Sequence, residues 1–226
     1  MRGRKRNIYR EKLDNPYPKE YDELYTVISL VLCYDKALEA FFEEGCHTDN
    51  PDFQNEKLDL GIEVTRAYTP QQNEHLPIIN NYFGKNYKQD FVREEIKKRF
   101  PHVLKHLSFR PFAWFFDYCD TKVFINELQN SIVDKLYKLN NGYRVFQHNW
   151  LYLFAGSSVI HETDIANLKN KEMESYHIPF SKIFINCRNK IFVLENYELI
   201  KTIFLSDEEL TQIKKRAFER VENNAS

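Results

Sequence analysis

The chain has 226 residues with a formal net charge of −1, and 42% of them are hydrophobic and 29% charged, a composition typical of a globular domain. The six glycines form no G-x-x-x-x-G-K or G-x-G-x-x-G run, which argues against nucleotide binding of those two kinds. Because the net charge is near zero, a nucleic-acid partner has to be met by a local basic patch.

The cysteines and the apolar runs indicate where the chain is expected to work. Cys33, Cys46, Cys119 and Cys187 form no C-x-x-C pair, and no secretory signal is recognised, so we expect reduced thiols in a cytoplasmic protein. The longest apolar run, over residues 27–32, is far too short to span a bilayer, and no membrane partner is expected.

The amino-terminal segment predicts a basic arm followed by a helix. Residues 1–12 carry six basic residues against one acid, which is typical of a disordered arm, and we place its boundary at residue 14. Pro18 fits the first turn of a helix that runs to about Glu44 and ends at Gly45. We expect residues 15–226 to form a single domain. The apolar face of the first helix consists of Leu24, Val27, Ile28, Val31, Leu32, Leu38 and Phe42.

An acid-bearing β-hairpin is predicted next. Asn50-Pro51-Asp52-Phe53 forms one arm and residues 58–67 form the other, with Glu63 eleven residues after Asp52. Two carboxylates aimed at one point repel each other unless a cation lies between them, and Mg²⁺ does this with oxygen ligands. The alternative is an ordinary hairpin with a polar edge, because Asp after Pro is common at turns. Strand alternation places Leu58, Leu60, Ile62 and Val64 on one face and Asp59, Gly61, Glu63 and Thr65 on the other.

The remaining chain predicts helices and strands in a mixed order. A loop that could cover a groove (69–82) and a helix (88–107) lead to an aromatic-rich segment (109–118). A helix (121–140), a strand (150–155) and a hairpin with arms at 181–187 and 190–194 follow. Ser206-Asp207-Glu208-Glu209 has capping-box spacing and opens a last helix to about Val221. This order predicts the α/β class, with a central mixed β-sheet flanked by helices.

The acidic hairpin and its flanking elements resemble a known family. The order helix, hairpin, helix, strand, with Asn50-Pro51-Asp52-Phe53 and Gly61-Ile62-Glu63-Val64-Thr65-Arg66, resembles the PD-(D/E)xK nuclease superfamily over about residues 15–160. The resemblance implies a restriction-endonuclease-like core in which Asp52 and Glu63 are catalytic residues that hold Mg²⁺ or Mn²⁺. Thr65 stands where the motif has its lysine, so the chain resembles a divergent member. The Thr65 hydroxyl could hydrogen-bond a water molecule at the metal, but it supplies no positive charge.

We therefore expect the missing cation from another element. At about 100° per residue, Lys135 falls inside the apolar stripe of the helix 121–140, between Ile132 and Leu139. Lysine is rarely buried without a partner, so Lys135 could reach the carboxylates as a catalytic residue. The alternative is that its ammonium group extends along the stripe to solvent. Lys138 is a weaker candidate, and Arg66 points to the opposite side of its strand from Glu63.

Further metal ligands are expected from the first helix and from the hairpin backbone. The family often adds a glutamate from its first helix, for which we prefer Glu20 or Glu23, and Glu39 stays open. An acid near a helix N-terminus also interacts favourably with the helix dipole, which is the structural alternative. The backbone carbonyl of Val64 is a further candidate ligand.

Together these expectations describe a metal-dependent nuclease that hydrolyses phosphodiester bonds of nucleic acid, in a defence or mobile-element system. We expect Lys97, Lys98 and Arg99 to contact the phosphates, with DNA preferred over RNA. A homodimer or a partner protein is left open. The alternatives are a catalytically degenerate nuclease-like fold that binds nucleic acid or protein, and an immunity or inhibitor protein in which the carboxylates are incidental.

Overall fold

The computed structural model describes residues 19–40, 46–47, 50–68, 94, 98, 107–110, 113–116, 121–155, 160–187 and 189–224. The chain divides into two units, one formed by residues 19–68 and 121–226 and the other by residues 1–18 and 69–120. The expected basic arm at 1–14 lies outside the described residues. A single domain over 15–226 stays a prediction.

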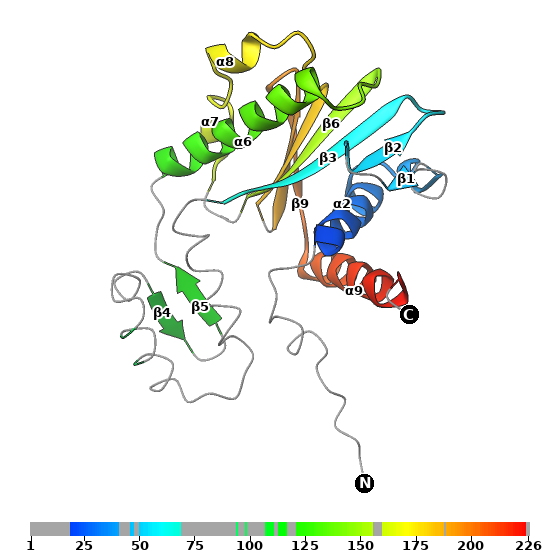
Figure 1. The fold of residues 1–226 in the computed structure, drawn as a ribbon. Coiled ribbons are helices and arrows are strands. Elements are labelled where there is room, and N and C mark those ends of the chain that lie inside the picture. The colour runs from blue at the N-terminus through cyan, green and yellow to red at the C-terminus, as the bar shows by residue number, and fades with distance from the viewer. Residues whose placement is uncertain are drawn as a thin grey trace. The chain divides into compact units, whose positions relative to one another are not determined.

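Within the described residues, seven strands of the first unit form one mixed sheet in the order β1-β2-β3-β6-β7-β8-β9 (Figure 1). β3 pairs in parallel with β6, and β6 with β7, whereas the other neighbours pair antiparallel. The predicted mixed sheet is confirmed. The strands are β1 (Cys46–His47), β2 (Phe53–Asn55), β3 (Leu60–Ala67), β6 (His148–Ala155), β7 (Lys182–Asn186), β8 (Lys190–Glu195) and β9 (Glu198–Phe204).

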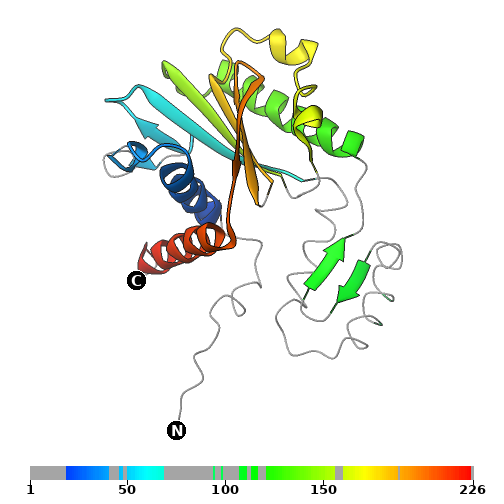
Figure 2. The same cartoon turned by 180° about the vertical axis from the view of Figure 1, so that it is seen from behind.

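Helices cover both faces of this sheet, as the two opposite views show (Figures 1 and 2). On one face, α6 (Thr121–Asn141), α7 (Glu162–Ile165) and α8 (Lys171–Glu174) pack over β6, β7 and β8. On the other face lies α2 (Lys19–Cys33), and α9 (Asp207–Asn224) packs against α2. The connection between the parallel strands β3 and β6 passes through the other unit and ends with α6, which leads into β6.

The helix α6 forms as its sequence pattern predicts. Its apolar residues recur at helical spacing, and the buried face presses on the sheet. Each of these side chains stabilises the fold by roughly 1.5–3 kcal/mol relative to an exposed position. The helix ends at Asn141, just before Gly142. The buried residues are Phe124, Leu128, Ile132, Leu136 and Leu139.

The two faces of β3 contact different helices. Leu60, Ile62 and Val64 pack in the cluster that contains α2, whereas Ala67 packs in the cluster that contains α6. The alternation predicted for this strand is therefore confirmed, and the Glu63 face is covered rather than open to solvent. Leu58 does not belong to the apolar face of β3, although it was predicted there. Residues 56–59 form the turn before β3, and Leu58 is 49% exposed.

The first helix ends earlier than predicted. It was expected to reach about Glu44, but α2 ends at Cys33. The N–H groups of Tyr34 and Asp35 both bond the carbonyl of Leu30, and the Asp35 carboxylate then accepts a hydrogen bond from the N–H of Ala37. Aspartate competes with helical bonding in this way, so the chain turns before helical backbone resumes at Leu38.

The carboxyl-terminal part confirms the predicted hairpin and last helix and adds one strand. β7 and β8 form the hairpin, and Ser206 and Glu209 form the reciprocal bonds of a capping box at the start of α9. β9, paired antiparallel with β8, was not predicted.

The other unit contains a short hairpin of β4 (Leu107–Arg110) and β5 (Ala113–Phe116). Its strands lie partly in the segment identified by sequence as aromatic-rich. Glu94 and Lys98 are helical, in agreement with a helix in the range 88–107, but Leu107 already belongs to β4. The predicted helix therefore ends before residue 107, and the expected loop at 69–82 lies outside the described residues.

Candidate metal site

The β2–β3 hairpin brings Asp52 and Glu63 together. Phe53 is the register partner of Ile62, so Asp52, one residue before β2, stands next to Glu63 on β3. β2 begins only at Phe53, so Asp52 lies just before the strand pairing with β3, and its carboxylate accepts the N–H of Val64 at 2.7 Å. Both carboxylate side chains are buried, with 1% and 3% exposure. Asp52 is thus held by the backbone of the strand that carries Glu63.

A lysine from α6 meets this pair. Nζ of Lys135 lies 2.6 Å from Oε1 of Glu63, and only 14% of the Lys135 side chain is exposed. The Lys135 ammonium group was predicted either to reach the carboxylates or to extend along the apolar stripe to solvent, and in the structure it reaches Glu63. Its proposed catalytic role stays a prediction. Lys138, the weaker candidate, pairs instead with Asp134 on the exposed side of the helix.

Tyr143 is a residue of the site that the sequence analysis missed. Its hydroxyl donates to Oε1 of Glu63 at 3.0 Å, so this oxygen has two donors. Tyr143 follows α6 directly, after the Asn141-Gly142 stop, and its N–H bonds the carbonyl of Lys138. The helix stop is visible in the sequence and shows that the chain reverses here, but it does not show which residue turns back to the sheet.

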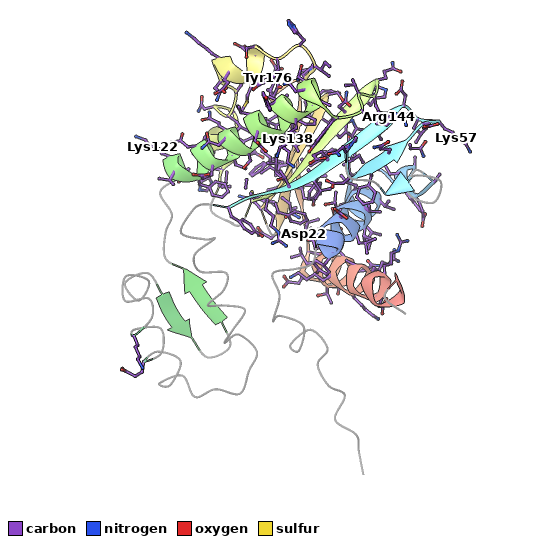
Figure 3. All side chains as sticks on the ribbon, viewed as in Figure 1. Asp22, Lys57, Lys122, Lys138, Arg144 and Tyr176 are labelled. Atoms are coloured by element: carbon purple, nitrogen blue, oxygen red, sulfur yellow. The ribbon has the colours of Figure 1, made fainter. Side chains whose placement is uncertain are left out.

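The segment after Tyr143 is attached to the acidic hairpin. The N–H of Arg144 donates to the carbonyl of Asn50, and the Arg144 guanidinium pairs with Glu56 at 2.7 Å. The N–H of Gln147 donates to the Asp59 carboxylate. In Figure 3, Arg144 accordingly lies beside the hairpin that carries Lys57, whereas Asp22 lies on α2. These bonds fix the connection between α6 and β6 relative to the carboxylates.

Burial and nearby negative charges raise the pKa values of Glu63 and Tyr143. Burial, and then the negative charge of Asp52, raise the pKa of Glu63, while Lys135 and the Tyr143 hydroxyl act in the opposite direction. Burial and the charges of Glu63, Asp52 and Asp134 raise the pKa of Tyr143, which keeps its proton on the hydroxyl. Oε2 of Glu63 is buried and has no hydrogen-bond partner among the residues that the structure describes.

The remaining predicted residues of the hairpin lie close to this pair. Thr65 is half-buried on β3, two residues after Glu63, and therefore on the same face. The N–H of Val64 is taken by Asp52. Because the N–H and the C=O of a strand residue point to the same side, the Val64 carbonyl faces the same edge. Arg66 pairs with Asp22 of α2, on the face opposite to Glu63, as its strand position predicts.

Two of the three acids expected from the first helix, Glu23 and Glu39, are described, and neither forms a group with the pair that could hold a metal ion. Glu23 is buried on α2, and Glu39 is exposed. In the described part of the chain, no three residues of the types His, Cys, Asp and Glu form a group that could hold a metal ion. Glu20 belongs to α2, but its side chain lies outside the described residues.

The basic residues expected to contact phosphates belong to the other unit. Lys98 is exposed, and Lys97 and Arg99 lie outside the described residues.

The donor set fits a hard divalent cation. Mg²⁺ is commonly held by one or two carboxylates together with water and substrate phosphate, and it prefers oxygen ligands. Asp52 and Glu63 supply two carboxylates, and the buried Oε2 of Glu63 is an acceptor that a cation would satisfy. A third acid is not required for such a site.

Comparison with protein-family models, with curated proteins and with solved structures found no match for this chain. Among the described residues, no helix is both long and apolar enough to cross a membrane.

Proposed function

We propose that this chain is a Mg²⁺-dependent nuclease with a divergent PD-(D/E)xK site on a restriction-endonuclease-like core. The observation that carries the proposal is the position of Lys135, whose ammonium group lies 2.6 Å from Glu63 although Thr65 occupies the motif position of the lysine. In this proposal a helix residue supplies, beside Glu63, the positive charge that Thr65 cannot supply. Mn²⁺ is the alternative cation.

Each residue of the site has a role in this proposal. Asp52 and Glu63 bind the cation through carboxylate oxygens, with the Val64 carbonyl as a further ligand. When bound, the cation lowers the pKa of a water molecule and neutralises negative charge on the phosphate that is attacked. The Lys135 ammonium group would orient the attacking water as a hydrogen-bond donor, and the Thr65 hydroxyl would hold that water by a hydrogen bond.

The substrate contacts belong to the same proposal. Lys97, Lys98 and Arg99 contact the phosphate backbone, which is the sequence-independent part of nucleic-acid binding. Of these, Lys98 is described and exposed. DNA is the preferred substrate over RNA in this proposal.

A second candidate function is a nuclease-like fold that binds nucleic acid or protein without catalysis. The ion pair between Lys135 and Glu63 favours it, because an ammonium group already compensates one of the two buried carboxylates without a metal. Thr65 favours it as well, since a hydroxyl cannot supply the charge of the motif lysine. The two candidates differ in whether a cation is needed and in whether nucleic acid is cleaved.

The test is a cleavage assay on labelled single- and double-stranded DNA and RNA, with Mg²⁺, Mn²⁺ or EDTA. We expect cleavage with either cation, none with EDTA, and none for Asp52→Ala or Glu63→Ala. Glu172→Ala, a change of an exposed acid on α8, is the matched control and should cleave like the wild type.

If no substrate is cleaved while the protein is folded, the nuclease proposal fails and the non-catalytic candidate takes its place. Thermal unfolding adds a second measurement, because a cation that binds only the folded chain raises the melting temperature. Asp52→Ala should remove that increase.

A further inference from the structure

We infer that Tyr143 is a positioning residue that, together with Lys135, holds Oε1 of Glu63 and leaves Oε2 as the oxygen that binds the divalent cation. The inference rests on the proposed function, because it specifies how the proposed metal ligand is oriented. It concerns a residue outside the acidic hairpin and outside the motif that suggested a nuclease.

The two oxygens of Glu63 have different surroundings. Oε1 accepts from the ammonium group of Lys135 at 2.6 Å and from the hydroxyl of Tyr143 at 3.0 Å. Oε2 is buried but has no hydrogen-bond partner in the part of the chain that the structure describes. Leaving a buried acceptor unsatisfied costs about 1–3 kcal/mol, and more for a charged group. A cation at Oε2 would remove this cost.

Tyr143 can hold Glu63 in one orientation because Tyr143 is itself fixed. Its segment is bonded to the hairpin at Asn50, Glu56 and Asp59, through Arg144 and Gln147. Within the hairpin, β2 is paired with β3, which carries Glu63. The Tyr143 hydroxyl and the Glu63 carboxylate are therefore held by the same hairpin. Tyr143 acts like the outer hydrogen-bond partners that orient ligands at metal sites.

The two donors on Oε1 differ in charge, and this separates their effects on a cation. The Lys135 ammonium group orients Glu63 but also repels a second positive charge nearby. The Tyr143 hydroxyl orients Glu63 without a net charge. Removal of the hydroxyl should therefore weaken cation binding, whereas removal of the ammonium group should not weaken it.

The test compares Tyr143→Phe with the wild type by calorimetric titration with Mn²⁺. The variant keeps the ring and loses only the hydroxyl, and we expect Mn²⁺ to bind about ten-fold more weakly, the lower end of the effect of orienting partners. The matched control is Tyr137→Phe, because Tyr137 lies on α6 and is 58% exposed. Its Mn²⁺ affinity should equal that of the wild type.

Two further measurements distinguish this inference from simpler outcomes. Unfolding of the metal-free variants measures the effect of Tyr143→Phe on stability alone. If Tyr143→Phe lowers stability but the folded protein binds Mn²⁺ with the wild-type affinity, the inference is overturned. Asp52→Ala tests the site itself. If the wild type binds Mn²⁺ and Asp52→Ala abolishes binding while Tyr143→Phe has no effect, the inference fails and the proposed function stands. If the wild type does not bind Mn²⁺, both fail.

Discussion

Lys135 on α6 and Glu63 on β3 are 72 residues apart in the chain, and their Nζ and Oε1 atoms lie 2.6 Å from each other. The contact follows from the topology. α6 is the last part of the connection between the parallel strands β3 and β6, and it covers the face of β3 to which Glu63 points. Within the buried stripe of α6, Lys135 occupies a position flanked by Ile132 and Leu139.

The first prediction concerns the loss of this ammonium group. Lys135→Met keeps a long apolar side chain but leaves Glu63 without its ionic partner, so we expect destabilisation by about 3 kcal/mol, the lower end for a broken buried pair. Cleavage should fall by about 100-fold or more, in line with the removal of a charged donor that stabilises the transition state. Denaturant unfolding and single-turnover cleavage measure the two effects.

Lys138→Met is the matched control for this change. Lys138 lies on the same helix, is 44% exposed and pairs only locally, with Asp134. Pairs of this kind contribute little, roughly 0–1 kcal/mol. Equal losses of cleavage in both variants would contradict a specific role for Lys135.

The second prediction is a rescue by a lysine at the motif position. Thr65 is half-buried on the same face of β3 as Glu63. A lysine there would present its ammonium group beside the same carboxylates, so Thr65→Lys should restore part of the cleavage lost in Lys135→Met. The measurement is the single-turnover rate of the double variant against Lys135→Met alone. A double variant no faster than the single one, though folded, would count against a shared role for the two positions.

Much of the fold follows from local patterns in the sequence. The stripe of α6, the alternation of β3 and the capping box of α9 are each set by residues close together in the chain, and periodicity reveals them. The pattern of α6 also placed Lys135 inside the stripe, but it left open whether the ammonium group reaches the carboxylates or extends to solvent. The same reasoning did not reveal the break after Cys33, because the Asp35 turn replaces helical bonds without interrupting the apolar pattern.

Other features depend on contacts between distant parts of the chain. Tyr143 joins the site only because the segment after α6 is bonded to the hairpin, and those bonds have no local signature. β9 was not predicted because its residues are largely exposed and show no simple alternation. The turn before it also places Tyr197 at a φ of 67°, a conformation that a bulky residue rarely adopts.

The third prediction concerns pH. Burial and the charge of Asp52 raise the pKa of Glu63 above the ordinary value of 4.5, so the folded chain binds this proton more tightly than the unfolded chain. The stability gained from that proton is therefore complete below pH 4.5 and is lost as the pH rises through the raised pKa of Glu63. In metal-free buffer, the melting temperature of the wild type should therefore fall relative to that of Glu63→Gln as the pH rises from 4.5 through the raised pKa of Glu63.

Two comparisons check the cause of this pH dependence. Asp52→Asn removes the negative charge that, besides burial, raises the pKa of Glu63, so the fall in melting temperature relative to Glu63→Gln should move to lower pH. With Mn²⁺ present, the increase in the melting temperature of the wild type caused by the cation should grow as the pH rises. The reason is that cation and proton compete for the same carboxylate. A pH dependence unaffected by Asp52→Asn would show that the two carboxylates are not coupled.

The fourth prediction concerns the close approach of the backbone to two rings beside the site. A Cβ at Gly61 would lie 2.6 Å from Cδ2 of Phe146 and 2.8 Å from Cγ of Pro51, and both neighbours are buried. Gly61→Ala should therefore destabilise the protein by about 1–3 kcal/mol, as overpacking does. Each kcal/mol corresponds to roughly 2–4 °C in melting temperature for a chain of this size.

Gly61→Ala should affect the cation as well as the fold, because its two neighbours adjoin the site. Pro51 precedes Asp52, and Phe146 belongs to the segment that carries Tyr143, so a shift of either ring moves groups that hold the carboxylates. We expect both a lower melting temperature and weaker binding of Mn²⁺. Gly142→Ala is the matched control, because beyond its neighbours in the chain no atom of the described structure lies within 4 Å of a Cβ at that position. If both alanine variants unfold at the same temperature, the tight packing at Gly61 does not contribute to stability.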